Sequence, residues 1–392
     1  MTEENTFSRF ALDEPILRAL KDMNFEKPSP IQEKTLPVIM DGSDVIALAE
    51  TGSGKTAACA IPICQKVQAE KKHIQALVLV PTRELALQYA TETQKVGKYK
   101  GLSTLAVYGG ADADVQQAKL KHMVHICVAT PGRLIDFIYS RQLDLSHVEI
   151  LVLDEADEMM SMGFIDDLNF IIACLIHEHQ TLLFSATMPE PIRKLAKDYM
   201  REPQEVILNK SRQQPKTIEH IFSYCRSRRD KDHLLKEFLE DEGLSQALIF
   251  CSSRLQCEDL AAALKPKFTS SVDFLHGGLA QNIRSIVISK FRQKKIRYLV
   301  TSDIAARGLD FSKVSHVIMY QLPRDAQTYL HRSGRTGRFG ASGKSMALIS
   351  DKDLKVAREI EKILGKSLTW IKKPAPRKKA PVKSYQRKPK RG

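Results

Sequence analysis

A glycine-rich turn between a strand and a helix is the clearest chemical signal in this 392-residue sequence. Residues 49–56 read Ala-Glu-Thr-Gly-Ser-Gly-Lys-Thr, after the apolar run Val45–Ala49 and before a helix of small residues. Backbone N–H groups in such a turn, and in the helix that follows it, direct positive dipoles at phosphate groups. The first Gly of the general pattern is Ala49 here, so the match is to a variant. The Lys-Thr pair in frame disfavours an ordinary surface turn.

The turn therefore predicts a nucleoside triphosphate site. Lys55 supplies a positive charge for the phosphates, and the Thr56 hydroxyl can bind Mg²⁺. The predicted ligands of the nucleotide are Thr51, Gly52, Ser53, Gly54, Lys55 and Thr56.

A second signal is an apolar run that ends in two acids, about 100 residues downstream. Ile150–Leu153 reads as a buried strand, so Asp154 should lie at its carboxyl end beside the glycine-rich turn, where open α/β sheets bind ligands. We predict that Asp154 holds Mg²⁺ through water and that Glu155 orients and deprotonates an attacking water. An exposed Asp-Glu pair at a strand end is the alternative, and the nearby phosphate turn disfavours it.

Strand–helix alternation supplies the framework for these residues. Short apolar runs alternate with helix-period segments such as Arg83–Val96 and Gly132–Ser140. Continuous apolar runs are typical of parallel strands covered on both faces. The predicted strands of the first half are Val45–Ala49, Ala76–Val80, Ser103–Val107, His125–Ala129, Ile150–Leu153 and Thr181–Phe184.

The alternation stops at a polar stretch, residues 208–217, and then resumes. The sequence thus predicts an α/β domain at 1–207, a linker at 208–217, a second α/β domain at 218–368 and a basic disordered tail at 369–392. We see no sequence repeat that relates the two domains. The predicted strands of the second domain are Ile218–Tyr224, Gln246–Cys251, Ser271–Leu275, Tyr298–Thr301, His316–Tyr320 and Lys344–Ile349.

The net charge is +14 and is unevenly distributed. Ten Lys and Arg and no acid lie between Ile371 and Gly392, which leaves +4 for the first 370 residues. Such a tail indicates a polyanionic partner, with a solubilising tail or nuclear targeting as alternatives. The seven scattered cysteines form no Cys-x-x-Cys pair, which favours a reducing compartment, and no apolar run is long enough for a membrane span. We expect a soluble, cytoplasmic protein without a membrane partner.

Residues 154–157 read Asp-Glu-Ala-Asp, and from about Phe7 to about Leu364 the chain resembles the DEAD-box RNA helicases. The resemblance implies two RecA-like doubly wound parallel-sheet domains, with ATP and Mg²⁺ as cofactors. Residues 25–32 resemble the adenine-recognising motif of the family, in which Phe25 stacks on the base, Gln32 hydrogen-bonds its edge and Lys27 is a further nucleotide-binding residue. The family usually has Gly where this chain has Asn24, which concerns only the local turn.

The resemblance also implies how hydrolysis is coupled to RNA. Ser185 and Thr187 match the motif that couples the two, with Asp157 as its partner. In the second domain, Arg335 and Arg338 match arginine fingers for the γ-phosphate, and Asp310 matches the ribose contact.

The family's RNA-backbone contacts carry over to both domains. They favour phosphate and 2′-hydroxyl recognition, which reads RNA without reading its sequence. The helix from Arg133 resembles the family's strand-bending wedge. The predicted RNA contacts are Pro81, Thr82, Arg83, Gly109, Gly110, Thr130, Arg133, Gln281, Arg284 and Thr301.

Two functions use all of these motifs. One is an RNA-stimulated ATPase that unwinds short duplexes or remodels RNA–protein complexes; the other is an ATP-gated RNA clamp with little unwinding. A DNA-translocating helicase is disfavoured by the adenine motif, the DEAD tetrad and Thr187 together. We expect a monomer with possible ribonucleoprotein partners, and the sequence leaves the physiological RNA open.

Overall fold

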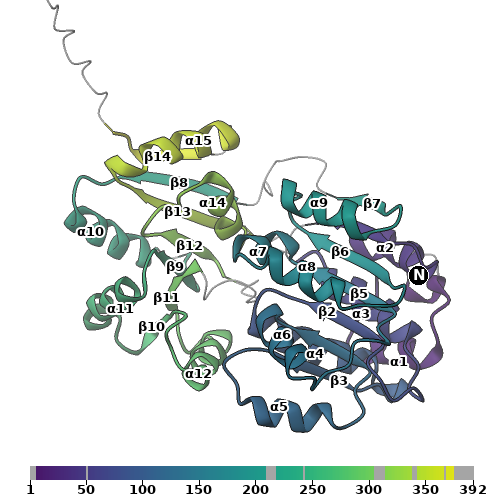
Figure 1. The fold of residues 1–392 in the computed structure, drawn as a ribbon. Coiled ribbons are helices and arrows are strands. Elements are labelled where there is room, and N and C mark those ends of the chain that lie inside the picture. The colour runs from purple at the N-terminus through teal and green to yellow at the C-terminus, as the bar shows by residue number, and fades with distance from the viewer. Residues whose placement is uncertain are drawn as a thin grey trace, which may run out of the picture.

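Two parallel α/β lobes lie side by side in the computed structural model (Figure 1). The structure describes residues 6–49, 52–208, 218–241, 243–303, 314–337, 342–365 and 368–374, without the side chains of Ser270 and Gln281. Two predicted nucleotide ligands (Thr51 and Asp310), the arginine finger Arg338 and the side chain of Gln281 therefore lie outside the described residues. None of the described helices has the length and apolar character that crossing a membrane requires.

Lobe one holds a seven-stranded parallel sheet among the described residues, in the order β3-β4-β2-β5-β6-β1-β7. Its strands are β1 Val45–Leu48, β2 Ala76–Leu79, β3 Thr104–Val107, β4 Ile126–Ala129, β5 Ile150–Asp154, β6 Gln180–Ser185 and β7 Gln204–Ile207. Its helices are α1 Glu14–Asp22, α2 Pro30–Met40, α3 Lys55–Lys66, α4 Arg83–Val96, α5 Ala113–Leu120, α6 Pro131–Tyr139, α7 Ala156–Ser161, α8 Ile165–Ala173 and α9 Glu190–Tyr199, with 3-10 turns at Phe7–Phe10 and Lys98–Lys100.

Lobe two holds a second seven-stranded parallel sheet, β10-β11-β9-β12-β13-β8-β14. Its strands are β8 Ile218–Tyr224, β9 Ala247–Cys251, β10 Val272–Leu275, β11 Tyr298–Ser302, β12 His316–Met319, β13 Gly343–Ile349 and β14 Leu368–Lys372. Its helices are α10 Arg228–Leu239, α11 Arg254–Phe268, α12 Gln281–Arg292, α14 Ala326–Ser333 and α15 Leu354–Leu364, with 3-10 turns at Thr269–Ser271 and Asp351–Asp353. When the strands are counted within each lobe, the two sheets have the same order, so the lobes share a topology that no sequence repeat reveals.

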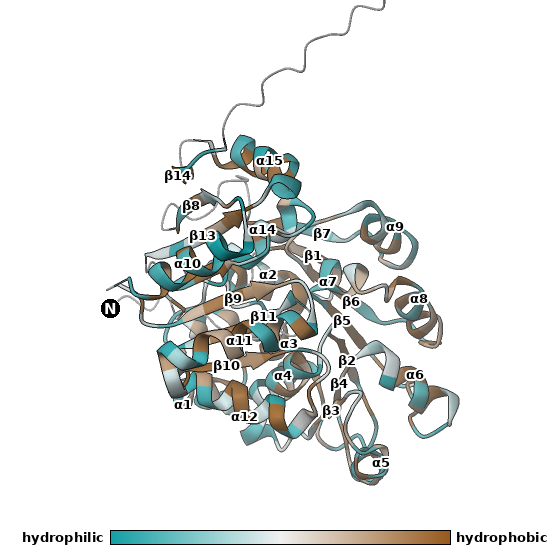
Figure 2. Ribbon diagram, turned by 90° about the vertical axis from the view of Figure 1, so that its left-hand side faces the viewer, coloured by the Kyte–Doolittle hydropathy of each residue, from teal (hydrophilic) through white to brown (hydrophobic). Residues whose placement is uncertain are grey.

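Each sheet is buried on both faces, because alternate strand residues enter opposite cores. In β5, Ile150 and Val152 join the core under α1, α3 and α4, whereas Leu151 and Leu153 join the core under α6 to α9. In lobe two, α12, α14 and α15 cover one face and α10 and α11 cover the other. Figure 2 shows the strands of lobe one as a largely apolar layer between helices.

All twelve predicted strands are present, with ends that differ by at most one residue. The two strands that the sequence did not predict are the edge strands β7 and β14. In β7 only Val206 is buried, so its sequence carries almost none of the apolar signal of a central strand. Its ladder continues to Leu208, whose N–H donates to the Leu48 carbonyl, so the linker prediction was wrong at that residue; 209–217 lie outside the described residues.

The predicted start of the tail was also wrong. Residues 369–372 belong to β14, which pairs with β8. Trp370 anchors this strand: its ring packs edge-on against Phe222, with centroids 5.2 Å apart, and its Nε1 donates to Glu361 at 3.1 Å. The flanking lysines masked this signal in the sequence. Residues 375–392 lie outside the described residues.

Trp370→Ala removes this half-buried anchor, and we expect the free energy of unfolding of lobe two to fall by about 2 kcal/mol. Urea denaturation followed by circular dichroism measures the change. The control is Thr369→Ala, which changes an exposed neighbour on the same strand and should cost less than about 0.5 kcal/mol. Equal effects of the two substitutions would show that the indole is not an anchor.

Candidate functional site

The glycine-rich turn joins β1 to α3 and has the backbone geometry that only glycine adopts easily. Gly52 and Gly54 have φ of +86° and +95°, in the left-handed region. The side chain of Lys55 is buried, and its Nζ donates to the Ala49 carbonyl at 3.1 Å, across the mouth of the turn. The lysine is thus held where a phosphate oxygen could replace a carbonyl oxygen as its acceptor.

The adenine motif packs directly on this turn. Ser29 stands at the N-cap of α2, where its N–H donates to Gln32 Oε1 at 2.8 Å, and Gln32 Nε2 donates to the Gly54 carbonyl at 3.1 Å. A Cβ atom at residue 54 would lie 2.7 Å from both Gln32 Nε2 and Ser29 Oγ, so only glycine leaves room for this contact. Two predicted motifs, 22 residues apart in sequence, are therefore one surface.

The segment before α2 also brings Phe25 into position. Asn24 has φ +57°, which explains why glycine suits this place and why asparagine, the residue that best tolerates such φ, is accepted. The Phe25 N–H donates to the Leu20 carbonyl at 2.9 Å, and its ring is half-buried against the lobe-one core. Lys27, by contrast, is exposed.

The two acids at the end of β5 are buried beside Lys55. Asp154 Oδ1 accepts the N–H of Glu155 at 2.8 Å, and Glu155 itself has φ +53°. A left-handed glutamate is strained, and such strain is common at functional sites. Burial raises the pKa of Asp154, and the charge of Lys55 opposes the rise.

Glu155 has the more unusual environment. Burial raises its pKa to about 6; Lys55 and Arg335 oppose the rise, whereas Asp154 and Glu158 add to it. Its Oε2 is buried without a hydrogen-bond partner among the described residues, as are the hydroxyls of Ser29 and Ser53. Buried polar atoms without partners are costly, which indicates that a ligand completes this site.

The oxygen donors of the turn fit a magnesium–nucleotide complex. Within the described part of the chain, no three His, Cys, Asp or Glu side chains gather as a metal site. Thr56 and Asp154 offer one hydroxyl and one carboxylate. Mg²⁺ usually takes one or two protein oxygens and completes its shell with phosphates and water.

Asp157 connects the DEAD segment to the end of β6. Its N–H donates to Ser185 Oγ at 3.2 Å, and its Oδ2 accepts both the N–H and the hydroxyl of Thr187, at 2.9 and 2.8 Å. The predicted partnership of Asp157 with the Ser-Ala-Thr motif is therefore present.

Lobe two approaches these residues through α14 and the loop after it. Arg332 forms a fork with Asp303, with both N···O distances 2.6 Å, and its guanidinium lies 4.9 Å from the centre of the Phe250 ring. His331 Nδ1 lies 3.3 Å from Glu158 Oε1 of lobe one. Arg335 is buried and close enough to Glu155 to act on its carboxyl electrostatically.

A solvent-open pocket of about 330 Å³ lies at this junction. It combines Glu158 of lobe one with residues of lobe two. Those residues are Phe250, Asp303, Thr328, His331, Arg332 and Arg335.

The predicted RNA motifs of lobe one meet at the carboxyl ends of β2, β3 and β4. Thr82 caps α4, since its Oγ1 accepts the Leu85 N–H at 3.3 Å. A Cβ atom at Gly110 would lie 2.4 Å from Arg83 Nη1, so this arginine lies flat on the glycine turn.

The third motif joins the other two through Arg133, whose Nη1 donates to the Ala111 carbonyl at 3.3 Å. Pro81 precedes the Thr82 cap, Gly109 belongs to the glycine turn, and Thr130 occupies the N-cap position of α6 without a side-chain cap hydrogen bond. Three motifs that lie between Pro81 and Arg133 in the sequence thus form one surface.

The RNA predictions for lobe two have a different outcome. Arg284 is buried, and its Nε and Nη2 both donate to Glu84 Oε1 of lobe one, the former at 3.0 Å, while Nη1 donates to the His276 carbonyl. Thr301 is fully buried, and its hydroxyl donates to the Ser302 carbonyl. RNA contact by these two residues stays a prediction, and here their polar atoms are engaged by protein groups.

Among the described residues, sequence reasoning missed two contacts between the lobes: the ion pair of Glu84 with Arg284, and the approach of His331 to Glu158. The partners are 200 and 173 residues apart, and a single acid on a helix carries no local signal for a distant partner. The one clue in the sequence was that Glu84 and Arg284 carry opposite charges and both lie in segments predicted to contact RNA.

Two family models match the chain: DEAD/DEAH box helicase at residues 29–195, and helicase conserved C-terminal domain at residues 230–340. The ATP-dependent RNA helicase CshA of Listeria monocytogenes is 41% identical over 94% of this chain and 70% of its own length. Dbp5 of S. cerevisiae bound to RNA and ADP BeF3 is 30% identical, with a TM-score of 0.85 over 94% of this chain and 96% of that one. A DEAD box protein from Methanococcus jannaschii is 36% identical, with a TM-score of 0.54 over 95% and 100%.

The whole-chain TM-score is high only when both lobes superpose at once. The lobes here are therefore arranged as in the Dbp5 complex with RNA and nucleotide, although the sequence is more similar to the Methanococcus protein.

Reversing one charge of the Glu84–Arg284 pair places like charges in a buried contact, which is strongly unfavourable. We expect Glu84→Arg or Arg284→Glu to lower the closed population at least tenfold, and the double exchange to recover much of it. Energy transfer between dyes on the two lobes, with RNA and ADP BeF3 added, measures closure.

The control is Arg201→Glu, which breaks an exposed ion pair with Glu178 inside lobe one and should leave closure unchanged. Normal closure of both single variants would show that the pair does not hold the lobes together.

Proposed function

Because the chain belongs to the DEAD-box family of ATP-dependent RNA helicases, we propose that ATP is hydrolysed at the junction of its two lobes and that RNA drives their closure. One observation supports this most strongly. The buried carboxyl of Glu155 has an oxygen without a hydrogen-bond partner in the part of the chain that the structure describes, and this carboxyl interacts electrostatically with Arg335 of the other lobe.

In the proposed reaction, Lys55 exchanges the Ala49 carbonyl for a phosphate oxygen, and Gln32 and Phe25 hold the adenine. Glu155 Oε2 accepts a proton from the attacking water as the water oxygen bonds to the γ-phosphorus and the bond to the β,γ-bridging oxygen breaks. Arg335 stabilises the charge that develops on the phosphoryl oxygens, a role that we also assign to Arg338. Mg²⁺ bound by Thr56 and Asp154 would neutralise part of the phosphate charge.

RNA binding is proposed to favour the same closed state. The surface formed by Thr82, Arg83, Gly110 and Arg133 offers donors and helix N-termini to phosphates without reading bases. Since α4 begins in this surface and carries Glu84, RNA would hold α4 where it can pair with Arg284. Each ligand then favours the closed arrangement, so ATP and RNA must strengthen each other's binding reciprocally. Asp157 and Thr187 would couple the two events.

Local unwinding of short duplexes is the function we favour, and an ATP-gated clamp is the alternative. The wedge helix α6 supports unwinding, because it starts at the RNA surface that Arg133 completes. Multiple-turnover displacement of a strand from a short duplex separates the two: the clamp would bind tightly, hydrolyse slowly and release no strand.

We propose a cytoplasmic monomer that meets ribonucleoprotein substrates. The seven cysteines are free, and six of them are buried, which fits a reducing compartment.

Glu155 makes hydrolysis depend on pH. Since burial raises its pKa to about 6, the carboxylate that accepts the proton is lost as the pH falls through 6. With saturating RNA, kcat should drop about tenfold per unit below that pH and level off above about 7. Glu155→Gln should lower kcat by a factor of ~10² or more at every pH while RNA binding in the presence of ATP persists. A rate independent of pH between 5 and 8 would remove Glu155 from this role.

The basic tail is proposed to tether RNA through counterion release. Ending the chain after Lys373 keeps β14 and removes eight Lys and Arg. The slope of log affinity against log salt should become shallower by ~0.7 for each cation that meets a phosphate of single-stranded RNA. The measurement is fluorescence anisotropy with labelled RNA across a salt series, and an unchanged affinity at low salt would exclude the tether.

A further inference from the structure

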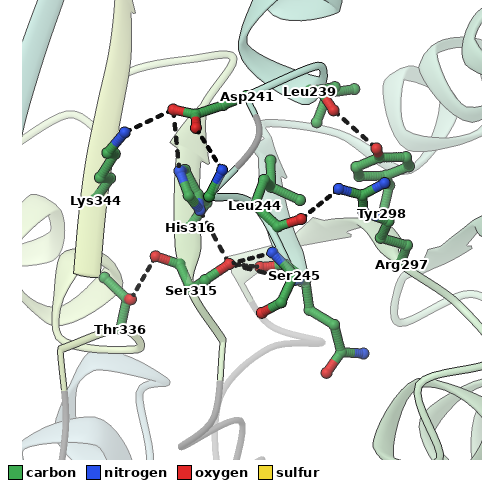
Figure 3. Close-up of polar contacts among 12 residues, drawn as sticks. Leu239, Asp241, Leu244, Ser245, Arg297, Tyr298, Ser315, His316, Thr336 and Lys344 are labelled. Atoms are coloured by element: carbon green, nitrogen blue, oxygen red, sulfur yellow. Dashed lines mark hydrogen bonds and ion pairs between the residues drawn. The ribbon is translucent and has the colours of Figure 1, made fainter. Parts of the chain in front are cut away.

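Thr336, the neighbour of Arg335, is fastened to the chain just before β12. Its side chain is buried, and its hydroxyl lies 2.6 Å from the Val314 carbonyl oxygen. Figure 3 shows its second contact, 3.0 Å from the Ser315 carbonyl oxygen. The Ser315 carbonyl already accepts the Lys344 N–H. The shorter of the two Thr336 contacts is the one to the Val314 carbonyl. Thr336 and Val314 also form a parallel β-bridge. The loop that carries Arg335 is therefore attached to the sheet one residue beyond the arginine.

A glycine makes this attachment possible from the other side. A Cβ atom at Gly343, the first residue of β13, would lie 2.2 Å from Thr336 Oγ1 and 2.6 Å from the Gly337 nitrogen. Real side chains do not approach so closely, so any other residue here would displace the loop. Gly343 therefore belongs to the same attachment.

Ser315, whose carbonyl is one of the two acceptors of Thr336, is itself held by polar groups. Ser315 Oγ accepts the Ser245 and Gln246 N–H groups at 3.0 and 3.2 Å and donates to the Gln246 carbonyl at 3.0 Å. The ring of His316 follows, with Nδ1 3.0 Å from Ser315 Oγ (Figure 3).

Asp241 closes this cluster from the end of α10, 2.6 Å from Lys344 Nζ and 3.7 Å from His316 Nε2. Ser315, one of the two acceptors, thus belongs to a polar cluster that links the starts of β9, β12 and β13 and supports the loop.

We propose that Thr336 is a positioning residue, whose hydroxyl sets the place of the Arg335 guanidinium opposite Glu155. The inference rests on the proposed role of Arg335. A guanidinium on a long side chain stabilises developing charge only when its backbone is fixed, and a displacement of about 1 Å can cost a factor of ~10² in rate.

The test replaces the hydroxyl and measures RNA-stimulated ATP hydrolysis by the full chain. Thr336→Val keeps the branched shape of the side chain but removes the hydrogen-bond donor. Thr336→Ala also removes the donor, and it places no methyl group against the carbonyls. Both should lower kcat about tenfold and leave the KM for ATP within a factor of about two, because the lobe-one contacts with ATP are unchanged. Thr336→Ser, which keeps the hydroxyl, should stay within about twofold of the wild-type rate.

Arg335→Ala supplies the background that separates positioning from general damage. If Thr336 acts through Arg335, then adding Thr336→Val or Thr336→Ala to Arg335→Ala should lower kcat no further. The matched control is Thr93→Val, which removes an equally buried threonine hydroxyl in α4, bonded to the Tyr89 carbonyl, and should leave kcat unchanged.

Losses that multiply in the double variants, or wild-type rates for both Thr336→Val and Thr336→Ala, would overturn the inference and leave the role of Arg335 intact. A wild-type rate for Arg335→Ala would overturn that role and, with it, the positioning by Thr336.

Discussion

A buried charge needs an opposite charge nearby, and at the junction of the lobes part of that charge comes from the other lobe. Glu84 and Glu155 belong to lobe one and face Arg284 and Arg335 of lobe two, although Lys55 of lobe one is the larger counter-charge of Glu155. Taking a carboxylate out of water costs several kcal/mol unless a cation or hydrogen bonds replace the solvent. Neither lobe can therefore keep these side chains in their present surroundings without the other. The present contact between the two lobes depends in part on this division of charge.

The two lobes have the same strand order but different residues after the first strand. Their sheets share one strand order, yet only lobe one has a phosphate turn after its first strand. In lobe two the corresponding strand, β8, is followed by a capping box of Ser227 and Asp230 that starts α10 and contains no glycine. The second lobe contributes instead the basic residues of α14 and its loop. A duplicated scaffold thus provides two complementary faces, one acidic and phosphate-binding, the other basic.

Several groups in lobe one are placed at a cost that a ligand would offset. Glu155 has a strained backbone and an oxygen without a hydrogen-bond partner among the described residues, and the hydroxyls of Ser29 and Ser53 are buried in the same condition. These atoms surround the glycine turn and the end of β5. Their arrangement is fixed by packing of the core beneath them, so the part of the site that lobe one supplies is preorganised.

The amino-acid sequence alone was sufficient for everything that depends on neighbours along the chain. The central strands follow from continuous apolar runs, and the phosphate turn follows from its glycines and the Lys-Thr pair. The sequence did not predict β7 and β14, because their sequences carry little apolar signal: Val206 alone is buried in the first, and a half-buried Trp370 lies among lysines in the second. Only the tertiary structure decided that Arg284 meets Glu84, that Ser29 and Gln32 rest on Gly54, and that Thr336 fastens the Arg335 loop to Val314. The physical reason is that local patterns determine backbone shape and burial, whereas contacts between distant segments depend on how whole lobes pack.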